Sequence, residues 1–222
     1  MNEAMPTIDP LAVEILTRLA GRPEASEIVL GGYFALQQYL GHRETHDIDA
    51  WWRTLPRGDT EAVLREVVAD VAAGRAMTVR ERRFGDTLSL EMLREGKKCF
   101  SVQIAVRSVT LDEPLLSPWP PVLIETLHDN MGSKMNALVD RGAPRDFVDI
   151  YSACEARLVT SALCWGLWAK KNPGSSIDAA KQKVLFHLSG LEARRPLTSI
   201  ADFAEREQAE NTRSWFRAEF VQ

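Results

Sequence analysis

The sequence has few cysteines and no long apolar run. It carries 3 cysteines in 222 residues, and no two of them have the CxxC spacing. This odd, scattered set argues against a disulfide framework and against a structural zinc site. No stretch approaches the roughly 18 apolar residues of a membrane-spanning helix, and no basic segment followed by an apolar one opens the chain. We therefore expect a cytoplasmic protein with no membrane partner.

The sequence also lacks an excess of positive charge. Lys and Arg number 27 against 31 Asp and Glu, which gives a net charge of −4. No overall field therefore draws the chain to nucleic acid or to an anionic membrane, although a short acceptor end needs only a few basic residues. The apolar share of 45% and the charged share of 26% are ordinary for a soluble globular protein.

Hydrophobic periodicity predicts two domains of different composition. Four prolines between residues 114 and 121 mark a linker, so we predict one domain over residues 1–118 and another over 119–222. The predicted fold class is α+β, with a mixed β-sheet flanked by helices and then a C-terminal helical domain. The predicted strands cover residues 26–30, 47–52, 77–83, 87–93 and 99–109. The predicted helices cover residues 10–20, 33–40, 59–73, 122–140, 144–157, 161–171, 176–188 and 200–220.

The most informative segment pairs two glycines with two aspartates. Gly31 and Gly32 end an apolar run, and Asp47 and Asp49 follow after an amphipathic stretch. Alternation at period two places both aspartates on one face of a strand, with Ile48 on the other. Two carboxylates that point the same way repel each other unless a cation lies between them, and a hard divalent cation is the usual solution. Glycines let a backbone approach a phosphate closely. The pattern therefore predicts a site for Mg²⁺ and a nucleotide.

Two separated motifs resemble one known family. The first consists of Leu30-Gly31-Gly32, Gly41-His42-Arg43, Thr45 and Asp47-Ile48-Asp49, and the second follows K-x-x-A-L-x-x-R-x-x-x-R-D-x-x-D from Lys134 to Asp149. Together they resemble the AbiEii/AbiGii toxin family of the DNA polymerase β-like nucleotidyltransferase superfamily, over about residues 25 to 155. The resemblance implies a nucleotidyltransferase core, Mg²⁺ and a toxin of a toxin–antitoxin or phage-defence pair.

The resemblance also implies roles for individual residues. Gly31 and Gly32 would begin the phosphate-facing turn, and Asp47 and Asp49 would be the metal ligands. Lys134 would reach the triphosphate, because an ammonium on a long stem suits a mobile phosphate. Asp146 would lie near it as an acceptor or orienting group. Arg43 would contact phosphate or brace the loop before the carboxylate strand.

The second motif also has a purely structural interpretation. Arg145 and Asp149 are spaced i,i+4 on one predicted helix and can pair, as can Arg141 with Asp146 across the preceding turn. Asp146 in a first helical turn also favours the helix dipole. Both interpretations stay open for Asp146, and Asp149 fits the structural one better.

One position departs from the family pattern. Where the family tends to carry a third carboxylate, the strand Phe100 to Arg107 has Gln103. An amide can ligate Mg²⁺ weakly but carries no charge and cannot act as a base. Glu91, on the outward face of the adjacent hairpin strand, is a possible substitute.

Two other residue pairs carry less weight. His42 and His46 lack a third ligand and lie in a loop, which argues against zinc. One of Trp51 and Trp52 can stack on a base, but neighbouring strand residues face opposite ways, so at least one belongs to the core.

The leading hypothesis is an Mg²⁺-dependent nucleotidyltransferase that moves a nucleoside monophosphate from an NTP to a hydroxyl on a tRNA or other RNA end or on a protein, with an antitoxin as a further partner. The first alternative is a degenerate, non-catalytic protein of the same fold that binds a nucleotide or a partner, which Gln103 motivates. The second is a transferase acting on a small molecule such as an antibiotic.

Overall fold

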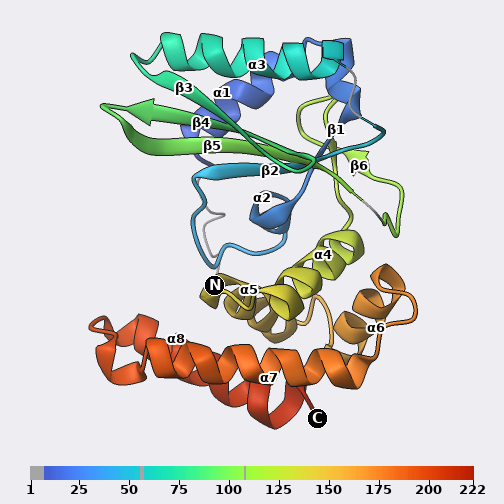
Figure 1. Cartoon of the computed structure of the whole chain (residues 1–222), viewed down its shortest axis with the longest axis vertical. Helices are drawn as coiled ribbons and strands as arrows, with labels where there is room; N and C mark the ends of the chain where they lie inside the picture. Colours follow the sequence, from blue (N-terminus) through green and yellow to red (C-terminus); the bar gives the residue numbers. More distant parts are fainter. Residues whose placement is uncertain (1–7, 56–57, 108) are drawn as a thin grey trace. The chain divides into compact units, whose positions relative to one another are not determined.

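The computed structural model describes residues 8–55, 58–107 and 109–222, and it divides into two compact units (Figure 1). The first unit comprises residues 1–130 and the second residues 131–222. The division falls inside helix α4 (Leu127–Asp140), twelve residues after the boundary predicted from the sequence.

A mixed β-sheet forms the centre of the first unit. In the described part of the chain it has seven strands in the order β3-β4-β5-β2-β1-β7-β6. The central strand β2 runs parallel to β5 and antiparallel to β1, and β1 runs parallel to β7. The remaining pairs are antiparallel. The strands are β1 (Ile28–Leu30), β2 (Asp47–Trp52), β3 (Thr78–Phe84), β4 (Thr87–Arg94), β5 (Lys97–Val106), β6 (Leu115–Leu116) and β7 (Leu123–Ile124).

Helices α1 (Pro10–Leu19) and α3 (Gly58–Ala73) cover one face of this sheet, as Figure 1 shows. Their apolar residues join the inward residues of β2, β4 and β5 in one buried cluster. Helix α1 begins where Asp9 accepts a hydrogen bond from the Leu11 amide at 2.8 Å, the N-cap that its Asp-Pro sequence predicts. Helix α2 (Gly32–Leu36) follows β1 and adds Phe34 and Ala35 to the same cluster, and it is shorter than the predicted helix over 33–40.

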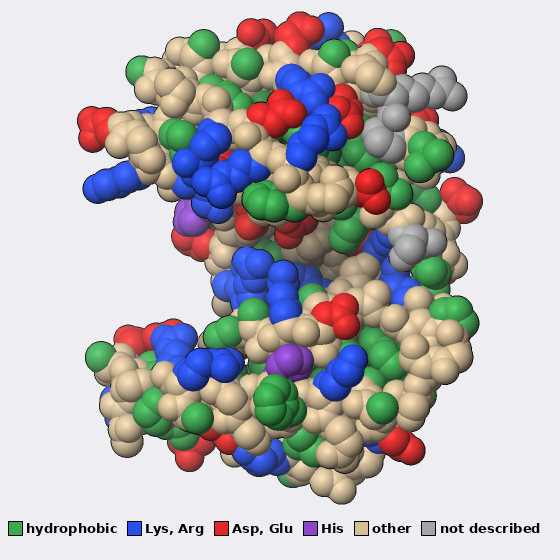
Figure 2. All heavy atoms as spheres, viewed as in Figure 1, with side chains coloured by type: hydrophobic (Ala, Val, Ile, Leu, Met, Phe, Trp, Pro, Cys, Tyr) green, Lys and Arg blue, Asp and Glu red, His purple; other side chains and the backbone are tan. Residues whose placement is uncertain are grey.

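The outer surface of α3 and β3 is polar and mixed in charge. Figure 2 shows basic and acidic side chains next to one another there, and Arg65 bonds Glu61 at 2.9 Å and Glu81 at 2.8 Å. Exposed ion pairs of this kind contribute little to stability but keep a surface soluble and without a large field of one sign.

The segment predicted as a linker continues the sheet instead. Residues 115–116 and 123–124 form β6 and β7, and the Glu125 amide donates to the Leu30 carbonyl oxygen at 2.9 Å. The prediction of one helix from residue 122 was therefore wrong over its first turn, because α4 begins at Leu127. A two-residue strand is too short to show an alternating pattern, and the prolines hid it.

The second unit is helical, as predicted. After α4 come α5 (Pro144–Glu155), α6 (Ser161–Lys171), α7 (Ile177–Arg194) and α8 (Phe203–Trp215), which ends in a π-helical turn over Phe216–Phe220. Aromatic residues fill its core; Phe147 meets Phe216 edge-on with ring centroids 4.8 Å apart. Across the described ranges of the chain, every helix is too short or too polar to cross a membrane.

Candidate active site

The carboxylate strand β2 spans the predicted residues, Asp47–Trp52, and shows the predicted alternation. Ile48, Ala50 and Trp52 are buried on the α1–α3 side, whereas Asp47, Asp49 and Trp51 lie on the opposite face and are half-buried. Thr45 donates its hydroxyl hydrogen to Asp47 Oδ1 and so fixes that side chain at the start of the strand. The strand therefore presents two carboxylates in the same direction on a rigid element.

The Gly31–Gly32 turn lies directly against this face. The Gly31 amide donates to the Asp49 carbonyl oxygen at 2.8 Å. Gly32 has φ of +58°, and a Cβ atom there would be 2.4 Å from Asp49 Oδ2, far inside contact distance. At Gly31 a Cβ would meet Trp51 Nε1 at 2.4 Å and Glu125 Oε2 at 2.8 Å. Both glycines are therefore required by the side chains of the site itself, in addition to any approach of a phosphate.

Gln103 occupies the position beside Asp49 on the neighbouring strand. In the parallel pairing of β2 with β5, Asp49 is opposite Gln103 and Asp47 is opposite Ser101. Residues paired in this way share one face of the sheet. The half-buried Gln103 amide is thus the uncharged neighbour of the Asp49 carboxylate, at the position that the sequence indicated.

Glu91 is less suited to replace the missing carboxylate. It lies on the predicted face, but it is opposite Ser101, so all of β5 separates it from Asp47. Arg80 bonds the Glu91 carboxylate at 2.7 Å and Arg82 lies 3.4 Å from it. The hydrogen bond from Arg80 lowers the pKa of Glu91, which keeps this carboxylate ionised and paired with the edge strand β3.

A buried polar network behind the glycine turn was missed by the sequence analysis. Glu125 and Asn130 are almost fully buried, and the Asn130 amide nitrogen donates to Glu125 Oε2 and to the Gly32 carbonyl oxygen, both at 2.8 Å. Arg107 pairs with Glu125 and lies 3.3 Å from Asp129. The sequence signal for this network is Glu125, a glutamate directly after the apolar run Val122–Ile124, the pattern of a carboxylate at the end of a buried strand. The prediction of a helix over the same residues hid that signal.

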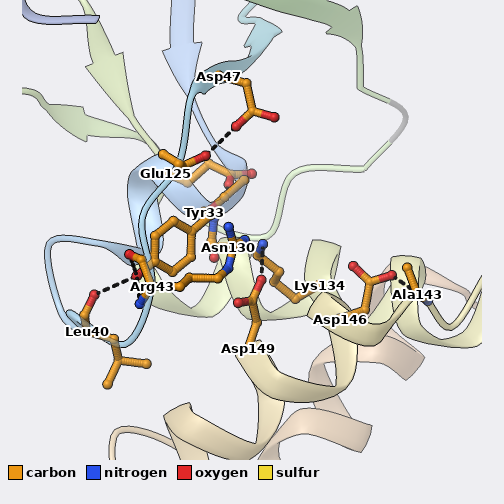
Figure 3. Close-up of polar contacts among 12 residues, drawn as sticks. Tyr33, Leu40, Arg43, Asp47, Glu125, Asn130, Lys134, Ala143, Asp146 and Asp149 are labelled. Atoms are coloured by element: carbon orange, nitrogen blue, oxygen red, sulfur yellow. Dashed lines mark hydrogen bonds and ion pairs between the residues drawn. The ribbon is translucent and has the colours of Figure 1, made fainter. Parts of the chain in front are cut away.

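Arg43 lies in the loop that leads to the carboxylate strand and contacts Tyr33 of α2. Its guanidinium lies over the Tyr33 ring, 3.6 Å from the centroid. The Tyr33 hydroxyl donates to the Arg43 carbonyl oxygen at 2.6 Å and accepts from the Arg43 amide at 3.0 Å (Figure 3). The loop is thereby tied to α2, which carries Tyr33.

In the second unit, Lys134 forms a buried ion pair with Asp149. Its Nζ lies 2.6 Å from Asp149 Oδ2, and the two side chains are 10% and 0% exposed (Figure 3). The sequence suggested Arg145 as the partner of Asp149, whereas α4 and α5 bring Lys134 to it. This pairing fixes the direction of the Lys134 ammonium and is consistent with a structural role for Asp149.

Asp146 makes the contacts of its structural interpretation. Its carboxylate accepts two hydrogen bonds from Arg141, each 2.9 Å long. It also accepts one from the Ala143 amide at 3.1 Å, which Figure 3 shows. These contacts link the start of α5 to the end of α4, and Asp146 is 1% exposed. Asp47 and Asp49 belong to the first unit, and Lys134 and Asp146 to the second.

Comparison with known protein families shows to which family this chain belongs. The model of the family described as nucleotidyl transferase AbiEii toxin, type IV toxin–antitoxin system, matches residues 14–218. This chain belongs to the AbiEii family. The match spans both units and includes both motifs from which the resemblance was drawn. No curated protein matches the chain.

The side-chain oxygens on this face of the AbiEii-family chain can be compared with the donor set that Mg²⁺ prefers. No group of three or more His, Cys, Asp or Glu side chains is arranged to hold a metal ion within the described residues. Mg²⁺ seldom uses a complete protein cage, because it is usually bound by one or two carboxylates together with substrate phosphates and water. Asp47 and Asp49, with the Gln103 carbonyl beside them, match that donor set.

Proposed function

We propose that this protein is an Mg²⁺-dependent nucleotidyltransferase that moves a nucleoside monophosphate from an NTP to a hydroxyl acceptor. The observation that carries the proposal is the pair Asp47 and Asp49 on one face of β2, packed against the Gly31–Gly32 turn. Membership of a nucleotidyl transferase toxin family supports the same reaction class. In the reaction, the acceptor oxygen forms a bond to the α-phosphorus, and the bond to the bridging oxygen breaks to release pyrophosphate.

The carboxylates would hold Mg²⁺, which supplies neutralisation of charge on the triphosphate when it is bound. The proton of the acceptor hydroxyl must leave during the attack. Gln103 is an amide and cannot take it. We assign the proton to Asp49, the carboxylate that Gln103 faces across the strand pair.

The remaining predicted residues would bind the phosphates or position the loops of the site. Gly31 and Gly32 would let the backbone of the turn approach the triphosphate beside Asp49, and Arg43 would hold the loop before β2. Lys134, with its ammonium directed by Asp149, would bind the β- and γ-phosphates. Asp146 would orient the segment that follows Lys134 through its bonds to Arg141.

The acceptor that we propose is a tRNA or other RNA end, or a protein hydroxyl. The family is one of toxins of type IV toxin–antitoxin systems, which supports an antitoxin as a further partner of this chain.

The first experiment measures pyrophosphate release from each NTP with Mg²⁺, with and without total tRNA. We expect Asp49→Asn to abolish release with a nearly unchanged thermal midpoint, because asparagine keeps the shape of this half-buried side chain and removes only its charge. Asp86→Asn, at an exposed turn position in the same unit, is the matched control and should retain full activity. Release that survives in Asp49→Asn would refute the proposal.

Gln103 favours a second candidate, a nucleotide-binding protein of this fold that has lost its chemistry. It predicts stoichiometric NTP binding without pyrophosphate release, even with Mn²⁺ and mixed RNA acceptors. It also predicts that Gln103→Asp, which restores a third carboxylate beside Asp49, brings release above background.

A further inference from the structure

A pocket of about 210 Å³ opens on the sheet face that carries Asp47 and Asp49, within the first unit. It lies at the carboxyl ends of β2 and β5. Trp51 provides an aromatic surface of the pocket, because it shares a face with Asp49, whereas Trp52 points into the core on the other side. The other lining residues include Val29, Arg53, Arg107, Glu113 and Glu125.

The indole of Trp51 is held in place on two sides. Its Nε1 edge abuts Gly31, where a Cβ would be 2.4 Å away, and the Arg107 guanidinium lies 5.0 Å from its ring centroid. Arg107 is itself fixed by Glu125 and Asp129. An aromatic surface that is already ordered loses little entropy when a ring stacks on it.

The charges of the pocket argue against a phosphate as its occupant. Three carboxylates, Glu113, Glu125 and Asp129, line it with two guanidiniums, so its formal charge is negative. The inner arginine is engaged by two of those carboxylates. At the mouth, Arg53 and Glu113 lie 3.9 Å apart and are 48% and 91% exposed, so they offer a donor and an acceptor to a neutral ligand. These features suit a planar heterocycle that bears both donors and acceptors.

We infer that this pocket binds the base of the nucleotide, which stacks on Trp51. The assignment rests on the proposed function for the identity of the ligand. Trp51 is two residues beyond Asp49 on the same face, about 7 Å along the strand, a separation that a ribose bridges. A base on Trp51 therefore places its own phosphates beside Asp49 and the Gly31–Gly32 turn, which the Trp51 indole also contacts.

The experiment compares NTP binding with binding of inorganic tripolyphosphate by calorimetry, in the presence of Mg²⁺, for wild type and variants. Loss of stacking weakens binding of a base by about 5- to 150-fold. We expect Trp51→Ala to lower NTP affinity by at least about fivefold and to leave tripolyphosphate affinity unchanged. Trp51→Phe, which keeps a stacking ring, should remain within about threefold of wild type.

Phe84→Ala is the matched control. Phe84 is an exposed aromatic residue in the same cross-strand row as Trp51, three strands away, so its removal should change neither affinity. Thr110→Phe fills the pocket from an exposed lining position, so it should weaken NTP binding without disturbing the core. This variant tests the inference even if Trp51→Ala does not fold.

Three results would overturn the inference: unchanged NTP affinity in Trp51→Ala, unchanged NTP affinity in Thr110→Phe, or an equal loss of NTP and tripolyphosphate affinity in Trp51→Ala. None of these measurements depends on turnover. Absence of pyrophosphate release would therefore count against the proposed transfer reaction and leave the base pocket standing.

Discussion

Replacing Gly32 by alanine tests whether the close contact between the glycine turn and Asp49 matters for catalysis. A Cβ at Gly32 would be 2.4 Å from Asp49 Oδ2 and 2.7 Å from Asp49 Cβ, where ordinary contact begins near 3.4 Å. The carboxylate must then move by about 1 Å, a displacement that typically costs about 10²-fold in rate. We therefore expect pyrophosphate release by Gly32→Ala to fall about a hundredfold at saturating NTP.

The stability cost of this change has a backbone part, and the contact with Asp49 Cβ at 2.7 Å, which rotation of the side chain cannot relieve, adds to it. An alanine at φ of +58° costs about 1–2 kcal/mol, which lowers the thermal midpoint of a chain of this size by roughly 2–8 °C. Gly85→Ala is the matched control, since Gly85 has φ of +55° and a Cβ added there would meet no atom within 4 Å. The two variants share the backbone cost, and the contact with Asp49 is specific to Gly32.

The assay is pyrophosphate release for both variants at a temperature at least 10 °C, as a rough margin, below their midpoints. Full activity in Gly85→Ala with a large loss in Gly32→Ala is the expected pair of results. Equal activity in the two variants would refute the argument, because it would mean that Asp49 tolerates the displacement or takes no part in the reaction.

Three further predictions concern buried and titrating groups. Glu125→Ala should lower the free energy of unfolding by about 3–5 kcal/mol, since it removes a buried carboxylate that pairs with the Arg107 guanidinium; chemical denaturation measures this. Lys134→Met should destabilise similarly, and the double change with Asp149→Leu should restore stability but not activity. The hydrogen bond to Asp9 raises the pKa of His46, so the contact stabilises the fold below pH of about 6.5 and is lost as pH rises through the folded-state pKa, which NMR titration of the imidazole follows.

Each of these predictions has its own control and its own contradicting result. Glu113→Ala removes a carboxylate that is 91% exposed and should change stability by less than about 0.5 kcal/mol, so an equal loss in both glutamate variants would contradict the first. Recovery of activity in the double variant would show that Lys134 serves the fold alone. An unchanged His46 pKa in Asp9→Asn would remove the basis of the third.

The carboxylate strand could be predicted to the residue because its signal is local. Apolar and acidic residues alternate strictly over β2, and burial follows the same alternation. The β4–β5 hairpin was predicted for the same reason, since its Glu95–Gly96 turn lies between two periodic runs. Such patterns need no knowledge of the rest of the chain.

The contacts around the site could not be predicted, because they join residues that no spacing rule connects. Asn130 donates to the Gly32 carbonyl oxygen, although the two residues are 98 positions apart in the sequence. The two-residue strand β7, which precedes Asn130 and pairs with β1, was hidden in the sequence by the prolines around it. Lys134 of α4 pairs with Asp149 of α5, whereas helical spacing within α5 indicates only Arg145 as a partner. The sequence therefore predicts which groups are present, and the tertiary structure decides which of them are paired.

The glycine turn is synthesised well before the residues that hold it in place. Gly31 and Gly32 leave the ribosome early, but β7, which pairs with β1, and the Glu125–Asn130 network that binds the turn come nearly a hundred residues later. At about 5–20 residues per second, the turn waits roughly 5–20 s for its partners during translation. Until then the β1 edge is unpaired on that side and the carboxylate face lacks its support. The proposed active site of this chain is therefore complete only after translation has passed the proline-rich segment.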